Sequence, residues 1–449
     1  MTTLRLALLF ARRQNLGDNR LAIALPIAAF NVVTAMLLIV LGGSRAVVAL
    51  GGELAPIYLF FTVVALALLV VPMVSLGAAA AKLSARRRDA RLSSLALLGA
   101  TQGQIARLTI IESAASALLG ALIGTALYLA LVPLVGLVQM GGAALGSALW
   151  LPWWWLPLVW LAVAAVAALS ALMGLRNVLV TPLGVRTRQL ARTPRKTRLI
   201  IAGILVAVGA VAITSWISIG QRTGPLGMVI ALFVGFGCGL LALDAVGPAY
   251  LALRARLSLA RAHNVERMLA ARTILDDPAT AWRHVSGLAL ATFVSVIAAA
   301  GLGVVDMVQN SADNPTETLL FADMRTGIYL TLAIAFIMVA ATVAISQAAN
   351  TLDRARVHVA MVRLGVPADL VSRASRRSVM SAVTGVMVGA GLLAALLMSP
   401  LIGLTMIARP IALIAMATAF GLGLLLVRGA ASISARLVPG ILARPDRVL

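Results

Sequence analysis

KLSARRRDARLSSLALLGATQGQIARLTIIESAASALLGALIG, residues 82–124, organises the chain because it joins two long apolar runs. The stretch carries six basic residues: Lys82, Arg86, Arg87, Arg88, Arg91 and Arg107. In its first part, Leu92, Leu95 and Leu98 recur at helical spacing and predict a helix with one apolar face. Such a face can lie on lipid or in a groove of another protein. Gly99 should end this helix, since glycine tolerates the left-handed backbone conformation of a helix stop.

Beyond Gly99, Thr101 and Gln104 have the spacing of a capping box, which predicts the start of a new helix. A fixed helical elbow at a membrane surface is therefore expected. A weaker copy recurs in residues 351–390, TLDRARVHVAMVRLGVPADLVSRASRRSVMSAVTGVMVGA. Aligning Gly99 with Gly365 also pairs Arg88 with Arg354, Arg91 with Val357, Leu95 with Met361, and Leu98 with Leu364. In the copy, Pro367 is expected in the first turn of the next helix, where proline is favourable.

Composition identifies the class of protein. Of the 449 residues, 61% are hydrophobic and 12% are charged, and the mean hydropathy is +1.02. A soluble core does not need that much apolar surface, so the sequence predicts a polytopic membrane protein. The single cysteine, Cys238, excludes a disulfide framework, and three scattered histidines offer no metal-ligand spacing, so no metal site is expected.

The number of spans follows from the apolar runs. An apolar segment of about 20 residues can cross the hydrocarbon core as a helix whose backbone groups are paired internally. Ten such runs are present, roughly at 21–43, 55–81, 109–135, 154–175, 199–219, 226–251, 286–308, 325–349, 377–399 and 408–428. The predicted fold is thus all-α with about ten transmembrane helices.

Basic residues set the expected orientation, because Lys and Arg are retained preferentially on the cytoplasmic side of a membrane. With both termini in the cytoplasm, 33 of the 37 Lys and Arg residues fall in cytoplasmic segments. This bias explains most of the net charge of +22 as a topological signal and as attraction to anionic lipid. No nucleic-acid partner is needed to account for the charge.

The expected domain organisation follows the two copies. Its parts are a cytoplasmic interfacial helix (1–20), a first half (21–175) with repeat 55–175, cytoplasmic linkers with spans five and six (176–285), a second half (286–428) with repeat 325–428, and a cytoplasmic tail (429–449). Each repeat also contains glycines spaced four apart, Gly120 with Gly124 and Gly385 with Gly389. Small residues at this spacing predict close helix packing in lipid.

Two groups of residues are expected on the outer side. Four acids lie around the connection at 306–323 with no basic residue among them: Asp306, Asp313, Glu317 and Asp323. They form either a solvated loop or an electrostatic lure for a cationic substrate such as a peptide. Four tryptophans, Trp150, Trp153, Trp154 and Trp155, precede the fourth span. They form either an interfacial belt or, at Trp153 and Trp154, an aromatic patch for a ligand.

Catalytic motifs are missing from the sequence. It contains no G-x-x-x-x-G-K-[ST] phosphate loop and no H-E-x-x-H or G-x-S-x-G stretch, so no enzymatic activity is expected in this chain. Asp276 and Asp277, before Pro278, either cap a helix or form a paired-carboxylate metal site. Asp244, near the inner end of the sixth span, either reaches the interface or serves an ion-coupled carrier.

The two copies, RRRDARLSSLALLGATQGQIARLTIIESAASALLGALIG and Arg354 to Ala390, resemble the FtsX-like permease family of ABC transporters, also called the MacB-like, BceB-like or type VII class. The segments VTPLGVRTR (180–188) and LAARTILDDPATAWR (269–283) are similar to its ten-span actinobacterial branch. Relatives usually have an acid eight residues before the elbow glycine, where this chain has Arg91 and Val357. Many also have a large extracellular domain, for which the connections here are too short.

By this resemblance, the elbows are coupling helices that dock on a separate ATP-binding subunit, which holds the ATP and Mg²⁺ that this chain does not bind. Two elbows in one chain imply two copies of that subunit. The residues implied at the interface are Arg88, Arg91, Leu92, Leu95, Leu98 and Gly99 in the first elbow, and Arg354, Val357, Met361, Leu364 and Gly365 in the second.

The function implied is export, extraction or sensing of an amphiphilic compound, such as an antimicrobial peptide, a lipid or a hydrophobic drug, with a role in antibiotic resistance. ATP-driven motion would be transmitted through the helices to their outer ends. The implied location is the bacterial cytoplasmic membrane, with a sensor kinase as a further partner. The alternatives are a membrane scaffold that signals to a sensor kinase or a cell-wall hydrolase, and an ion-coupled secondary transporter.

Overall fold

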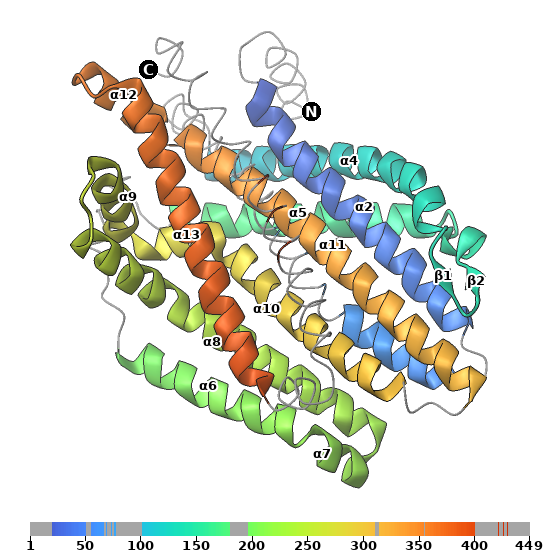
Figure 1. Ribbon diagram of the computed structural model, residues 1–449. Coiled ribbons are helices and arrows are strands. Elements are labelled where there is room, and N and C mark those ends of the chain that lie inside the picture. The colour runs from blue at the N-terminus through green and yellow to red at the C-terminus, as the bar shows by residue number, and fades with distance from the viewer. Residues whose placement is uncertain are drawn as a thin grey trace. The chain divides into compact units, whose positions relative to one another are not determined.

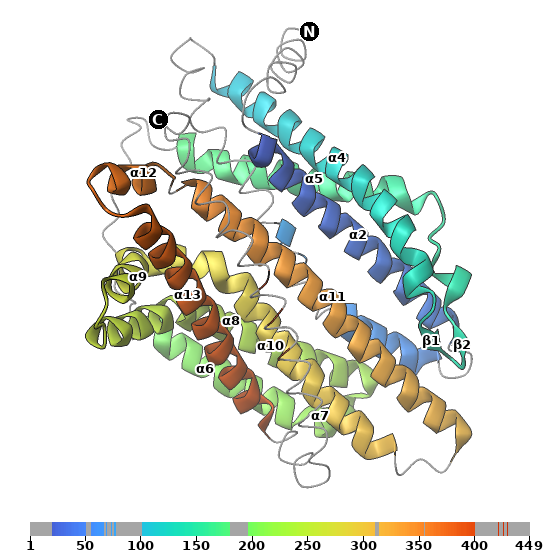
Figure 2. The ribbon, with the colours of Figure 1, turned by 45° about the horizontal axis from the view of Figure 1, so that its top comes forward.

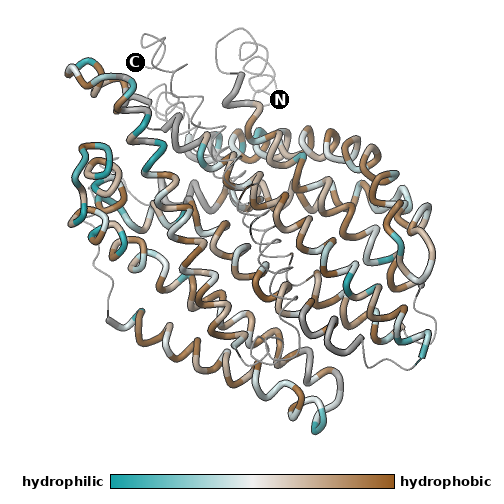
Figure 3. The backbone as a smooth tube through the Cα atoms, viewed as in Figure 1, coloured by the Kyte–Doolittle hydropathy of each residue, from teal (hydrophilic) through white to brown (hydrophobic). Residues whose placement is uncertain are grey.

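The computed structural model describes residues 20–50, 55–66, 69, 73, 76–77, 101–179, 196–309, 314–353, 355–399, 421, 425 and 429, and helices dominate it (Figure 1). Among the described residues, eight helices are long and apolar enough to cross a membrane. Hydrophobic residues run along these helices, and hydrophilic residues gather towards some of their ends (Figure 3). The chain is therefore a helical, polytopic membrane protein, as its composition predicts.

Eight of the ten predicted spans correspond to these helices. The second predicted span, 55–81, is described mainly as the shorter apolar helix Ala55–Leu66. The tenth, 408–428, lies outside the described residues except at 421 and 425. The predicted interfacial helix 1–20 and the tail 429–449 also lie outside them, apart from Arg20 and Gly429, as does 180–195 of the predicted linker.

The chain forms two compact units. The first contains α2 (Arg20–Leu50), α4 (Gln102–Val135), a short 3-10 helix (Gly146–Leu149) and α5 (Trp155–Leu179). The second contains the helix Ala55–Leu66, β1 (Gln139–Met140), α6 (Lys196–Thr214), α7 (Trp216–Thr223), α8 (Pro225–Ala260), α9 (Val265–Asp276), α10 (Pro278–Gln309), α11 (Pro315–Asp353), α12 (Ala355–Arg363) and α13 (Ala368–Leu397).

Prolines begin three long helices of the second unit. Pro225, Pro278 and Pro315 are the first residues of α8, α10 and α11. The first N–H of a helix has no intrahelical acceptor, so the missing N–H of proline costs nothing there, and the fixed φ angle favours the helix. The three prolines therefore set where these helices start.

In the first unit, α4 lies directly against α2. A Cβ added at Gly120 would lie 2.8 Å from the carbonyl oxygen of Ile27, and one at Gly124 would lie 2.6 Å from that of Asn31. Glycine is therefore required at both positions, and the two backbones approach closely there. Tyr128, which is buried, donates a hydrogen bond of 2.8 Å to the carbonyl of Leu149 and so fixes the segment after α4.

In the second unit, α8, α10 and α13 share a core. It is built from buried apolar side chains that include Leu243, Trp282, Phe293, Val383 and Met387. α11 runs beside α10 (Figures 1 and 2), and Leu332 and Phe336 of α11 pack there against Ala298 and Leu302 of α10. Two clusters of apolar side chains thus hold the helices that carry the second elbow.

A small β-hairpin is the one exception to helical structure within the described residues. β1 pairs with β2 (Ala143–Ala144), and the turn between them places Gly141 and Gly142 at φ +65° and +76°. Glycine is needed at both positions because side chains disfavour positive φ. The all-α prediction did not foresee this hairpin, whose turn contacts α11 as described below.

Candidate functional site

The first elbow is described only where its second helix begins. Arg88, Arg91, Leu92, Leu95, Leu98 and Gly99 lie outside the described residues. Thr101 caps α4: its hydroxyl accepts the N–H of Gln104 at 3.4 Å, and the Gln104 side chain accepts the N–H of Thr101 at 3.0 Å. The predicted capping box is therefore confirmed, and α4 starts directly after it.

The second elbow is the short helix α12 together with the turn that follows. The Val366 N–H donates to the carbonyl of Met361 at 3.1 Å, and the Gly365 N–H donates to that of Val362 at 3.0 Å. Gly365 has φ +90°, so this is a Schellman stop. The predicted glycine stop is confirmed. Arg354 lies outside the described residues.

The restart of the helix differs from the prediction by one position. Pro367 is the N-cap residue of α13, with φ −56° and ψ 131°, and the first turn begins at Ala368. The proline ring fixes φ of Pro367 at a helical value, but its ψ is extended. Pro367 therefore precedes the helix and is not part of its first turn. The two copies nevertheless agree in place, since Thr101 and Pro367 each lie two residues after their aligned glycines.

α12 presents an apolar face outward. Val357 is 57% exposed and Leu364 is 85% exposed, whereas Val359 is buried at 2%. Met361 is half-buried and lies between Val357 and Leu364 at helical spacing, so the three share one face. A helix with a fixed C-terminal end and an uncovered apolar face is suited to contact a lipid surface or another protein.

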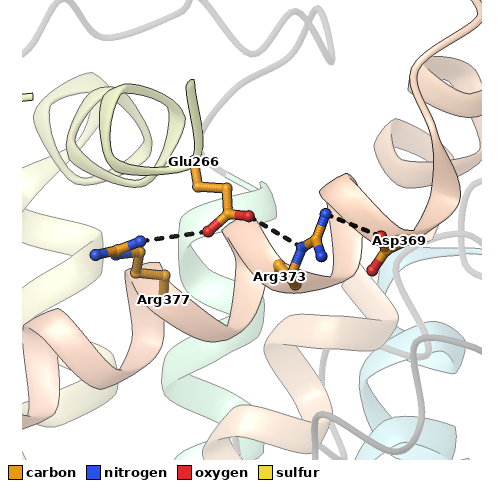
Figure 4. A network of polar contacts seen from close by, with 4 residues as sticks. All are labelled: Glu266, Asp369, Arg373 and Arg377. Atoms are coloured by element: carbon orange, nitrogen blue, oxygen red, sulfur yellow. Dashed lines mark hydrogen bonds and ion pairs between the residues drawn. The ribbon is translucent and has the colours of Figure 1, made fainter. Parts of the chain in front are cut away.

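A network of charges fixes the start of α13 beside α9 (Figure 4). Glu266 on α9 pairs with Nε of Arg373 at 2.9 Å and with Nη1 of Arg377 at 3.3 Å. Arg373 also pairs with Asp369, one turn earlier on α13, at 2.9 Å. No sequence pattern singles out Glu266. The Asp369 and Arg373 spacing is visible in the sequence, but the contact with α9 is not.

Asp277 caps α10. Its carboxylate accepts the N–H of Thr280 at 2.9 Å and the hydroxyl of Thr280 at 2.6 Å. Partial burial raises the pKa of Asp277, but the hydrogen bonds from Thr280 and the charge of Arg283 outweigh it and hold the pKa below its usual value. The capping alternative is thus the one that the geometry supports. Within the described ranges, no group of three or more His, Cys, Asp or Glu residues could hold a metal ion.

Asp244 on α8 has a protein partner. The indole N–H of Trp282 on α10 donates to its carboxylate at 2.7 Å. Asp244 is itself exposed, while Trp282 is buried. The carboxylate therefore links α8 to α10, and it does not lie in the buried interior of the unit.

The acidic outer loop predicted at 306–323 is mostly helix. α10 continues to Gln309 and α11 begins at Pro315, so Asp306 and Glu317 belong to helices, and Asp313 lies outside the described residues. Glu317 is exposed in the first turn of α11. Asp323 is buried at 5%, so it is not a loop residue. The prediction was wrong there because two uncharged donors from distant segments, the Tyr58 hydroxyl and the Gly141 N–H, accommodate the carboxylate inside the unit.

Those contacts join three segments of the second unit. The Tyr58 hydroxyl donates to Oδ2 of Asp323, and the Gly141 N–H lies 2.9 Å from both carboxylate oxygens. Met140, beside Gly141, is buried. Its terminal methyl group packs against α11 at Gly327, where an added Cβ would lie 3.4 Å from it. In the described part of the chain, no basic side chain pairs with Asp323.

The tryptophans before α5 are exposed. Trp153 and Trp154 are 80% and 54% exposed, and the rings of Trp154 and Trp155 are 5.3 Å apart. An exposed row of indoles beside a membrane span is typical of the interface with lipid headgroups.

The nearest neighbours of the second glycine pair are all side-chain atoms, whereas those of the first pair include backbone atoms of α2. A Cβ at Gly385 would lie 2.5 Å from Nη1 of Arg254, and one at Gly389 would lie 2.8 Å from the Tyr250 ring. Counted from the N-caps Thr101 and Pro367, the second pair also comes one residue earlier than the first. One residue is about 100° of helix rotation, so the two copies use different faces of their helices.

No family model, curated protein or solved structure matches the chain.

Proposed function

We propose that this chain is the membrane-spanning subunit of an ABC-type transporter of the FtsX-like class, and that α12 docks on a separate ATP-binding subunit. The observation that carries this proposal is the outward apolar face formed by Val357 and Met361 of α12 and by Leu364, the residue directly after it. A Schellman stop fixes one end of α12, and α11 precedes the other. An elbow of this kind can transmit a movement of a soluble ATP-binding subunit to the long helix α11.

The finer parts of the proposal follow from the duplicated elbow and the charge distribution. One chain would engage two ATP-binding subunits, which supply ATP and Mg²⁺. Both termini would be cytoplasmic in a bacterial plasma membrane, because the basic segments flank the spans on that side. The substrate class is an amphiphile, such as an antimicrobial peptide, a lipid or a hydrophobic drug, which is exported, extracted or sensed. In a sensing role, a sensor kinase is the further partner.

Co-purification with the ATP-binding subunits of the same genome tests this proposal, with native mass spectrometry to count subunits. We expect one chain with two ATP-binding subunits. The double variant Val357→Asp, Leu364→Asp should weaken the complex at least tenfold, because charges replace the apolar contact. Val265→Asp is the matched control: Val265 is 54% exposed on α9, at a helix start where Asp is tolerated. Equal binding by the double variant, or no complex with any such subunit, would contradict the proposal.

Asp323 favours an ion-coupled carrier as a second candidate. A buried carboxylate within a membrane-spanning helix is costly and often marks an ion or proton pathway. In this case Asp323→Asn should abolish flux driven by a proton or sodium gradient, and loss of a partner ATPase should not. Flux that continues in Asp323→Asn at the wild-type rate would eliminate this candidate.

A further inference from the structure

Arg254 occupies an unusual position on α8. It lies within the candidate span Ile230–Ala260, six residues or about 9 Å from its end. The side chain is half-buried, and its guanidinium covers Gly385 of α13. Nη2 donates a hydrogen bond of 3.4 Å to the hydroxyl of Thr384. Arg254 therefore contacts α13 at Gly385 and Thr384, where α8 and α13 pack together.

The charge of Arg254 has no counterpart within the protein that the structure describes. Arg373 pairs with Glu266 and Asp369, and Arg377 pairs with Glu266, whereas no described carboxylate pairs with Arg254. A guanidinium has five N–H donors, and Thr384 accepts one of them. A half-buried charge is costly unless an opposite charge or other hydrogen-bond partners compensate it. The remaining donors of Arg254 therefore call for an external anion.

The surroundings of Arg254 indicate what carries that anion. Leu253 and Leu257, its neighbours on α8, are 58% and 52% exposed, so apolar surface flanks the guanidinium on the outside of the unit. A free phosphate gains nothing from such surface, but the acyl chains of a phospholipid do. Arg254 also lies near one end of its candidate span, where headgroups and acyl chains meet in a bilayer.

We propose that Arg254 binds the phosphate of an anionic phospholipid where α8 and α13 meet. The planar guanidinium can donate two parallel hydrogen bonds to one phosphate, which lysine cannot do. Gly385 provides the space for the guanidinium, and Thr384 orients it. The site does not involve an ATP-binding partner, so its test is independent of the proposed transport function.

Lipid titration of the delipidated full-length chain in neutral detergent tests the site. The probes are dioleoyl phosphatidylglycerol, dioleoyl phosphatidylcholine and inorganic phosphate, and the measurements are native mass spectrometry and the midpoint of thermal unfolding. We expect phosphatidylglycerol to bind and to raise the midpoint, with no such effect from the other two. Arg254→Gln should weaken phosphatidylglycerol binding at least tenfold. Arg256→Gln, an exposed arginine two residues away, should leave it within twofold.

Gly385→Ala is the second test, and it leaves the charge of the protein unchanged. The added methyl would lie 2.5 Å from Nη1, so it displaces the guanidinium and should weaken lipid binding at least fivefold. Three outcomes would overturn the proposal. They are wild-type affinity in Gly385→Ala or Arg254→Gln, equal losses in Arg254→Gln and Arg256→Gln, and a shift by inorganic phosphate equal to that by phosphatidylglycerol.

Discussion

The hydroxyl of Tyr58 donates a hydrogen bond of 2.5 Å to the carboxylate of Asp323, across 265 positions of sequence, and both residues are buried. The same carboxylate accepts the N–H of Gly141. Asp323→Ala leaves both donors without an acceptor, which should lower the free energy of unfolding by about 1–3 kcal/mol. Thermal unfolding in detergent would measure the loss. Glu317→Ala, an exposed acid on the same helix, should change the stability by less than about 0.5 kcal/mol.

The contact of α4 with α2 predicts that substitutions at two glycines of α4, Gly124 and Gly103, differ strongly in their effect on stability. Gly124→Leu places a side chain where the Asn31 carbonyl is 2.6 Å from the Cβ position. The helices must separate, which should cost about 1–3 kcal/mol or prevent folding. Gly103, with open space around it, should accept alanine with no loss of stability. Yield of folded protein by size-exclusion chromatography, followed by unfolding midpoints, would compare the two variants. Similar stability of both variants would contradict the close contact.

The stop after α12 depends on a backbone conformation that side chains disfavour. Gly365→Ala should cost roughly 1–2 kcal/mol locally, because alanine is strained at φ +90°. Open space surrounds the Cβ position, so the cost is conformational and does not come from a clash. Gly365→Asn should recover part of it, since asparagine tolerates this region better. Hydrogen exchange at the Gly365 and Val366 amides reports the stop directly. Unchanged protection in Gly365→Ala would refute the prediction.

The cap at Asp277 predicts a dependence of stability on pH. Its pKa is lower in the folded protein than in the unfolded chain, so the ionised carboxylate stabilises the fold above the unfolded value of about 3.9. That contribution should disappear as the pH falls through the folded pKa. Asp277→Ala should therefore cost about 0.5–2 kcal/mol at pH 7 and progressively less below about pH 4. Unfolding midpoints of both proteins across this range give the difference. A difference that stays constant with pH would exclude the carboxylate as its source.

Local features of the sequence predicted their structures well. The capping box at Thr101, the glycine stop at Gly365 and the cap at Asp277 each depend on hydrogen bonds to residues within a few positions. The apolar runs also predicted the described spans, because length and hydropathy suffice for that purpose.

Contacts between distant segments could not be predicted in the same way. Asp323 was expected in a solvated loop because an acid near the end of an apolar run normally marks its boundary. Tyr58 and Gly141, which accommodate it, lie far away in sequence. The spacing of Gly385 and Gly389 indicated a helix contact, but only the structure identifies Arg254 and Tyr250 as the side chains that fill the space. The link from Glu266 to Arg373 was missed for the same reason.

The uninterrupted length of α11 has a mechanical consequence. From Asp323 to Asp353, the helix extends about 45 Å at about 1.5 Å per residue. If α12 docks on a motor subunit as proposed, a tilt of α11 by about 5° about Asp323, which Tyr58 and Gly141 hold, would carry the Asp353 end through roughly 4 Å. Because Leu332 and Phe336 of α11 pack against α10, such a tilt would have to move α10 as well.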